Sequence, residues 1–96
     1  MVVGVCRLTL AIPETGSLKG KRSILRRITG RVRREFNVAV AEVEEMDSWD
    51  SAVLGIAVVA NDHRFVNSVL DKVVQFVEEM HLADVEDYTH EIQHLL

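Results

Sequence analysis

The sequence predicts an α+β fold in which an antiparallel sheet carries two helices on one face. Two apolar segments have the length and composition of buried strands, and two others have the spacing of amphipathic helices. Each half of the chain has the order strand, helix, strand. The full order β-α-β-β-α-β, with right-handed crossovers, is the split βαβ or ferredoxin-like arrangement. We expect a single domain over residues 1–96, because a chain of this length is too short for two cores.

The first strand is expected over residues 2–12, which are β-branched, apolar on both faces and followed by Pro13. After a short loop, Ser17 is suited to cap a helix that continues to about Phe36. One face of this helix is apolar at helical spacing, and the opposite face is rich in arginine and lysine. Lys21 is the exception, because it falls within the apolar arc and would extend over the sheet edge or point into a site.

The second half of the chain repeats this pattern. Residues 38–45 alternate as an edge strand does, and residues 51–60 form a second strand that is apolar on both faces. The two strands that are apolar on both faces are expected side by side in the middle of the sheet. Asn61-Asp62 caps a second amphipathic helix, and we expect the polar tail over 82–94 to be the last edge strand.

The composition is that of a soluble globular protein, with 48% hydrophobic and 27% charged residues. The single Cys6 excludes a disulfide framework and favours a reducing, cytoplasmic location. No apolar run approaches the ~20 residues of a membrane span, so we expect no membrane association. There is no nucleotide-binding glycine loop, no nucleophile elbow and no Cys/His metal pattern. We therefore expect no cofactor and no metal.

The net charge of −4 conceals a strong asymmetry along the chain. Residues 1–36 carry a net charge of +7, and residues 37–96 carry −11. This division predicts one basic face and one acidic face. Lys19, Lys21 and Arg22 occupy the first turn of the expected helix, where the helix dipole favours acids instead. Like charges also repeat along that helix at spacings that cause repulsion.

A bound anion would make these placements favourable, and Gly20 in the first turn suits its close approach. We predict that the helix binds anions or a nucleic-acid backbone through Lys19, Lys21, Arg22, Arg26, Arg27, Arg31 and Arg34. The alternative is a solvated face whose cations pair with acids from the second half of the chain. The two central strands contain no aromatic residue, so RNA would be bound by charge and shape rather than by base stacking.

One face of the sheet is left uncovered by the helices and would expose apolar side chains. An apolar surface of that kind indicates a partner, and self-association is the simplest solution. We expect a homo-oligomer, most simply a dimer, with its interface at Val3, Val5, Ala57 and Val59. The chain would then function as a self-associating protein-interaction or ligand-sensing module.

A small hydrolase is a third reading, based on Glu42 and its neighbours Glu44, Glu45 and Asp47. Alternation along the strand places Glu42 and Glu44 on one face. Acids near the turn of an edge strand are ordinarily a solvated edge. The sequence accordingly assigns no catalytic residue.

A family resemblance rests on Ile12-Pro13, Ser17-Leu-Lys-Gly-Lys-Arg22, Phe36-Asn-Val38, Val40-Ala-Glu42, Leu54-Gly-Ile-Ala-Val58 and Asn61-Asp62. In combination these segments resemble the bacterial YlxP-like family, domain of unknown function 503. The resemblance implies a ferredoxin-like fold and a gene beside translation and ribosome-assembly genes, such as that of ribosome-binding factor A. It implies no activity and no catalytic residues. We therefore expect a non-catalytic protein that contacts RNA or a ribosomal particle through its arginine-rich helix.

Overall fold

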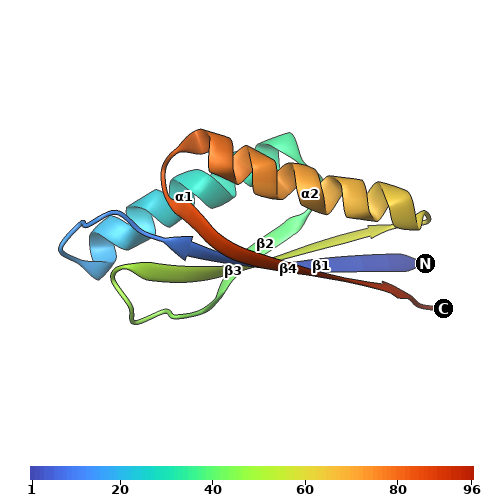
Figure 1. Cartoon of the computed structure of the whole chain (residues 1–96), viewed down its shortest axis with the longest axis horizontal. Helices are drawn as coiled ribbons and strands as arrows, with labels where there is room; N and C mark the ends of the chain where they lie inside the picture. The colour runs from blue at the N-terminus through green and yellow to red at the C-terminus, as the bar shows by residue number, and fades with distance from the viewer.

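The computed structural model describes residues 1–96 and contains six elements in the predicted order. They are β1 (Val2–Ala11), α1 (Leu18–Glu35), β2 (Ala39–Glu44), β3 (Ser51–Ala60), α2 (His63–Met80) and β4 (Asp84–His94). The strands form one antiparallel sheet in the order β2-β3-β1-β4, so the predicted ferredoxin-like fold is confirmed. Both helices lie on one side of this sheet, and the two termini lie at the same end of the molecule (Figure 1).

The two strands that are apolar on both faces occupy the middle of the sheet, as expected. β1 pairs with β3 over its whole length, from Val2 opposite Ala60 to Ala11 opposite Ser51. The polar tail forms β4, which pairs with the other side of β1 as a long edge strand. Successive side chains alternate between the helix-covered face and the open face.

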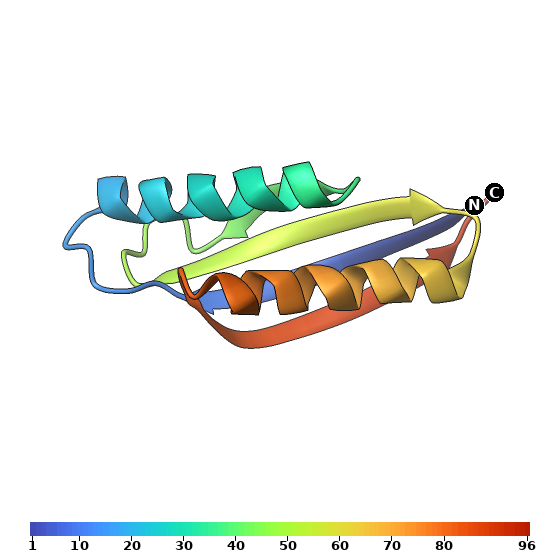
Figure 2. The same ribbon diagram turned by 90° about the horizontal axis from the view of Figure 1, so that it is seen from above.

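A single hydrophobic core lies between the sheet and the two helices, and it contains 19 buried residues. α2 lies over β1 and β4, and α1 lies toward β2 (Figure 2). The close approach of α2 to β1 depends on Gly4, because a Cβ atom there would lie 2.2 Å from Cγ1 of Val66.

Both predicted helix caps are formed. Ser17 Oγ accepts a hydrogen bond from the backbone N–H of Gly20 at 3.0 Å, and Asp62 Oδ2 accepts one from Phe65 at 2.9 Å. These bonds satisfy one of the free N–H groups that begin each helix. Neither helix combines the length and the apolarity that crossing a bilayer would require.

Candidate nucleic-acid interface

The cations of α1 are displayed on its solvent side because the opposite side supplies Leu25, Ile28 and Val32 to the core. No acidic residue occupies the first turn of α1. Six exposed cations, here called the arginine surface, follow this solvent side: Lys19, Arg22, Arg26, Arg27, Arg31 and Arg34. None of the six forms an ion pair, because the three ion pairs in the chain involve Arg7, Lys21 and His90. The acids of the second half therefore do not neutralise the arginine surface.

Four arginines of this surface converge on one hollow. Its volume is about 350 Å³, and its lining consists only of Arg26, Arg27, Arg31 and Arg34. The guanidinium carbon of Arg31 lies 5.7 Å from the centre of the Phe76 ring. Phe76 in turn contacts Phe36 edge to face, with ring centres 5.4 Å apart. A cation–π contact of this kind holds one guanidinium in place at the rim of the hollow.

A second hollow, of about 300 Å³, lies on the other side of α1, toward β2. Arg22, Arg26 and Arg33 contribute to its lining, so Arg26 borders both hollows. Arg33 also donates a hydrogen bond to the backbone oxygen of Val40 in β2, at 2.7 Å. This hydrogen bond ties the guanidinium of Arg33 to the edge strand.

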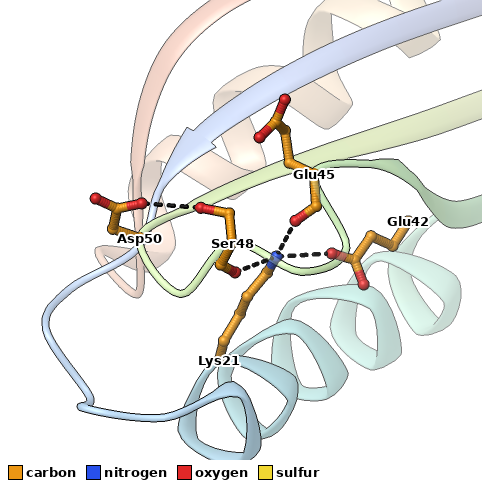
Figure 3. Close-up of polar contacts among 5 residues, drawn as sticks. All are labelled: Lys21, Glu42, Glu45, Ser48 and Asp50. Atoms are coloured by element: carbon orange, nitrogen blue, oxygen red, sulfur yellow. Dashed lines mark hydrogen bonds and ion pairs between the residues drawn. The ribbon is translucent and has the colours of Figure 1, made fainter.

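Lys21 does not belong to the anion-binding residues, and the prediction that placed it there is wrong. Its side chain is 1% exposed and points away from solvent, toward the loop between β2 and β3 (Figure 3). Nζ donates to the backbone oxygens of Glu45 at 2.6 Å and Ser48 at 2.8 Å, and forms an ion pair with Glu42 at 3.0 Å. The two backbone oxygens accept two of the three N–H groups of the ammonium, and Glu42 supplies the opposite charge. Lys21 therefore fixes a loop.

The first turn of α1 is also more enclosed than the sequence suggests. A Cβ atom on Gly20 would lie 2.5 Å from Cβ of Thr15, so this glycine makes room for a threonine rather than for an anion. Thr15 Oγ1 donates to the backbone oxygen of Ser17 at 3.0 Å, and Ser17 Oγ caps Gly20. The first turn of α1 is therefore closed by Thr15 and the Ser17 cap, and the exposed charge of the helix lies along its arginine surface.

The carboxylates of the predicted hydrolase site do not converge. A register shift in the pairing of β2 with β3, between Glu42 and Glu44, reverses the expected alternation. Glu42 consequently faces α1 and Lys21, whereas Glu44 accepts a hydrogen bond from Arg7 Nε at 2.9 Å on the open face. The prediction that both glutamates share one face is wrong, and the hydrolase reading loses the geometry on which it depended.

The Arg7–Glu44 contact is a two-bond ion pair at the surface. The hydrogen bond from Arg7 lowers the pKa of Glu44, and the same bond raises the pKa of Arg7. Both shifts favour the charged forms, as expected of an ion pair. This pair could not be predicted from the sequence, because its members are 37 positions apart and meet only through the sheet.

The predicted interface residues do share the open face of the sheet. Val3 lies opposite Val59, and Val5 lies opposite Ala57 on the neighbouring strand. Val5 is 42% exposed and Val59 is 61% exposed. A shallow apolar hollow of about 320 Å³ adjoins them, between β1, β3 and β2. The structure thus brings these four residues together as one apolar patch.

Two histidine contacts were not foreseen from the sequence. His63 Nδ1 lies 3.1 Å from His94 Nε2, which joins the start of α2 to the end of β4. His90 Nε2 lies 3.0 Å from Asp71 Oδ1. These contacts arise from the docking of α2 on β4, which brings together residues that are 31 and 19 positions apart. No group of three or more His, Cys, Asp or Glu residues is arranged to hold a metal ion.

Comparison with known proteins agrees with the fold. A designed protein with a ferredoxin fold aligns with the whole chain at a TM-score of 0.57 and 18% identity, over 88% of its own length. The structural-genomics protein YJCS aligns over 93% of this chain and 96% of its own, at a TM-score of 0.51 and 14% identity. At these identities the likeness is one of fold alone.

Sequence comparison identifies the family. The uncharacterized protein YlxP of Bacillus subtilis (strain 168) is 34% identical over 77 residues, which cover 80% of this chain and 84% of YlxP. The model of the family described as "Protein of unknown function (DUF503)" matches residues 3–90. The expected resemblance is confirmed, and the chain belongs to the DUF503 family of bacterial YlxP-like proteins.

Proposed function

We propose that this chain is a non-catalytic cytoplasmic protein that contacts RNA or a ribosomal particle through the arginine surface of α1. The observation that carries the proposal is the hollow lined only by Arg26, Arg27, Arg31 and Arg34. Four like charges around one hollow repel one another unless an anion neutralises them. Arginine presents a planar fork of N–H donors that matches the oxygens of a phosphate group.

The two hollows beside Arg26 suggest a path for the sugar-phosphate backbone of a bound RNA. Arg27, Arg31 and Arg34 line one hollow, and Arg26 borders both. The other hollow is lined by Arg22, by Arg33, which is also bonded to Val40, and by Glu42, whose charge is paired with Lys21. A phosphodiester strand that crosses α1 at Arg26 would place phosphates in both hollows. Because none of the arginine surface is paired within the chain, no internal salt bridge has to break before RNA binds.

Fluorescence polarisation of a labelled RNA hairpin, measured at several salt concentrations, tests the proposal. The six cations can contact roughly four to six phosphates, so the plot of log K against log salt should have a slope of about −3 to −5. Sequence preference should be weak, because phosphate contacts position a protein without reading bases. Co-sedimentation with ribosomal particles at low salt would then identify the larger target.

A charge-matched pair of variants isolates the arginine surface. Arg26→Gln with Arg27→Gln removes two cations from α1, and Arg64→Gln with Lys72→Gln removes two exposed cations from α2. The α1 variant should reduce the salt slope by about 1.5 and weaken binding evenly across sequences, whereas the α2 variant should have little effect. Equal effects of the two variants, or no RNA binding at low salt, would contradict the proposal.

We propose as a second function that the open face of the sheet mediates self-association. The exposed pair Val5 and Val59, beside an apolar hollow, supports it. Sedimentation velocity should find a dimer at micromolar concentration. Val5→Lys should shift that dimer to a folded monomer, because the side chain is already 42% exposed and its replacement does not disturb the core. A wild-type monomer at that concentration would exclude this function.

A further inference from the structure

A cavity lies away from the arginine surface, where two loops meet. Its volume is about 620 Å³, which is within the range of small-ligand sites. One wall comes from the segment between β1 and α1, and the other from the loop between β2 and β3. Only Ile12 and Trp49 are hydrophobic; the rest of the lining is Glu14, Thr15, Gly16, Asp47 and Asp50.

The walls of this cavity are fixed by contacts that the sequence alone does not explain. Buried Lys21 holds the backbone at Glu45 and Ser48, and Ser48 Oγ donates to Asp50 Oδ1 at 2.9 Å (Figure 3). The backbone N–H of Ile12 donates to the oxygen of Asp50 at 2.9 Å, which joins the two loops at their base. A site held in this way loses little conformational entropy when it binds a ligand.

The chemistry of the lining selects for positive charge. Glu14 and Asp47 are exposed and form no ion pair in the chain, so their negative charge is available to a ligand. Trp49 is 57% exposed, an unusual state for the largest apolar side chain. Tryptophan is the best aromatic partner for a cation, and neighbouring carboxylates strengthen that preference. An anion would be repelled, and a neutral apolar molecule would gain nothing from the acids.

We propose that this cavity binds an organic cation, an alkylammonium or guanidinium group held against Trp49 by Glu14 and Asp47. The group can belong to a free small molecule, such as a polyamine, or to a lysine or arginine side chain of another protein. The chemistry recognised is the same in both cases. The proposal is independent of RNA binding, because none of the arginine surface lines this cavity.

The protein carries its own reporter for this site, since Trp49 is its only tryptophan. Intrinsic fluorescence should change saturably with choline, spermidine or arginine amide at millimolar concentration. 3,3-Dimethylbutan-1-ol, the neutral isostere of choline, should produce no such change. A short basic peptide that binds at least tenfold more tightly than arginine amide would assign the cation to a protein partner. Equal affinity would assign it to a small molecule.

Single-charge variants test the role of the acids. Asp47→Asn should weaken choline binding about three- to fivefold, the range expected for an exposed ion pair. Glu91→Gln removes one exposed charge from β4, outside the cavity, and should leave the affinity unchanged. Saturable binding of the neutral isostere, equal loss in both variants, or an absence of any fluorescence response to all three cations would each overturn the proposal.

Discussion

Replacing Lys21 with methionine should destabilise the protein by about 3 kcal/mol, although the change adds an apolar side chain to an apolar environment. Methionine follows the lysine side chain as far as Cε, with sulfur in place of Cδ, and lacks the ammonium group. That group is buried and contacts Glu42, Glu45 and Ser48. Its loss leaves two backbone oxygens without a donor and one carboxylate without its counter-ion.

The magnitude follows from these three contacts. Leaving a buried acceptor unsatisfied costs about 1–3 kcal/mol, and breaking a buried ion pair from one side costs about 3–5 kcal/mol. Oε2 of Glu42 is buried, but the side chain as a whole is 25% exposed, so water can solvate part of the carboxylate and the lower end of the range applies. For a domain of this size, 1 kcal/mol corresponds to about 4–8 °C in Tm. The expected decrease in Tm is therefore about 12–24 °C.

Urea denaturation followed by circular dichroism measures the free energy of unfolding directly. Lys72→Met, on the exposed face of α2, is the matched control and should change it by no more than about 0.5 kcal/mol. Adding Glu42→Gln to Lys21→Met should recover part of the loss, since the uncompensated carboxylate is then gone. If Lys21→Met costs no more than the control, the loop is not held by this lysine and our account of it is wrong.

Two further predictions concern the core. Gly4→Ala should lower the free energy of unfolding by about 1–3 kcal/mol, because the new Cβ would overlap Val66. Gly30→Ala in α1 is the control: its Cβ meets only the flexible end of Arg34 at 3.7 Å, so it should stabilise the protein slightly. Equal effects of the two variants in thermal denaturation would contradict this prediction. Burial, and secondarily Asp71, raises the pKa of Cys6 from 9.0 to about 11. The protonated thiol thus stabilises the fold below about pH 9, and this stability is lost as the pH rises toward 11, so the urea midpoint should fall over that interval. Native protein at about pH 8 should react with a thiol reagent far more slowly than unfolded protein; equal rates would show that Cys6 is accessible.

The fold could be predicted because local pattern and global topology agree. The segments 2–12 and 51–60 are the most apolar ones, and the two central strands of a split βαβ sheet are the ones that have a neighbouring strand on each side and helices above them. The caps at Ser17 and Asp62 are equally local, since each side chain bonds a backbone N–H three residues later. Such signals can be read from a single sequence.

The site was predicted less completely, because its decisive features depend on positions far apart in the chain. A helical wheel places Lys21 in the apolar arc. Only the folded loop shows that its ammonium group donates to two backbone oxygens and pairs with Glu42. Strict alternation put Glu42 and Glu44 together, and one register shift separated them. A shift of this kind depends on strand pairing, which local propensity does not specify. The arginine surface was predictable because it belongs to one helix.

The hydrogen bond from Arg33 to Val40 has a consequence for aggregation. β2 is an edge strand of the sheet, and an edge strand has unpaired backbone groups with which a strand of another chain can pair. A guanidinium bound to one of its carbonyl oxygens occupies that template and places a positive charge beside it. This contact should therefore disfavour the pairing of copies of this chain edge to edge into extended sheets and fibrils. α1 thus exposes most of its arginines to solvent and uses Arg33 to protect an edge strand from pairing with another chain.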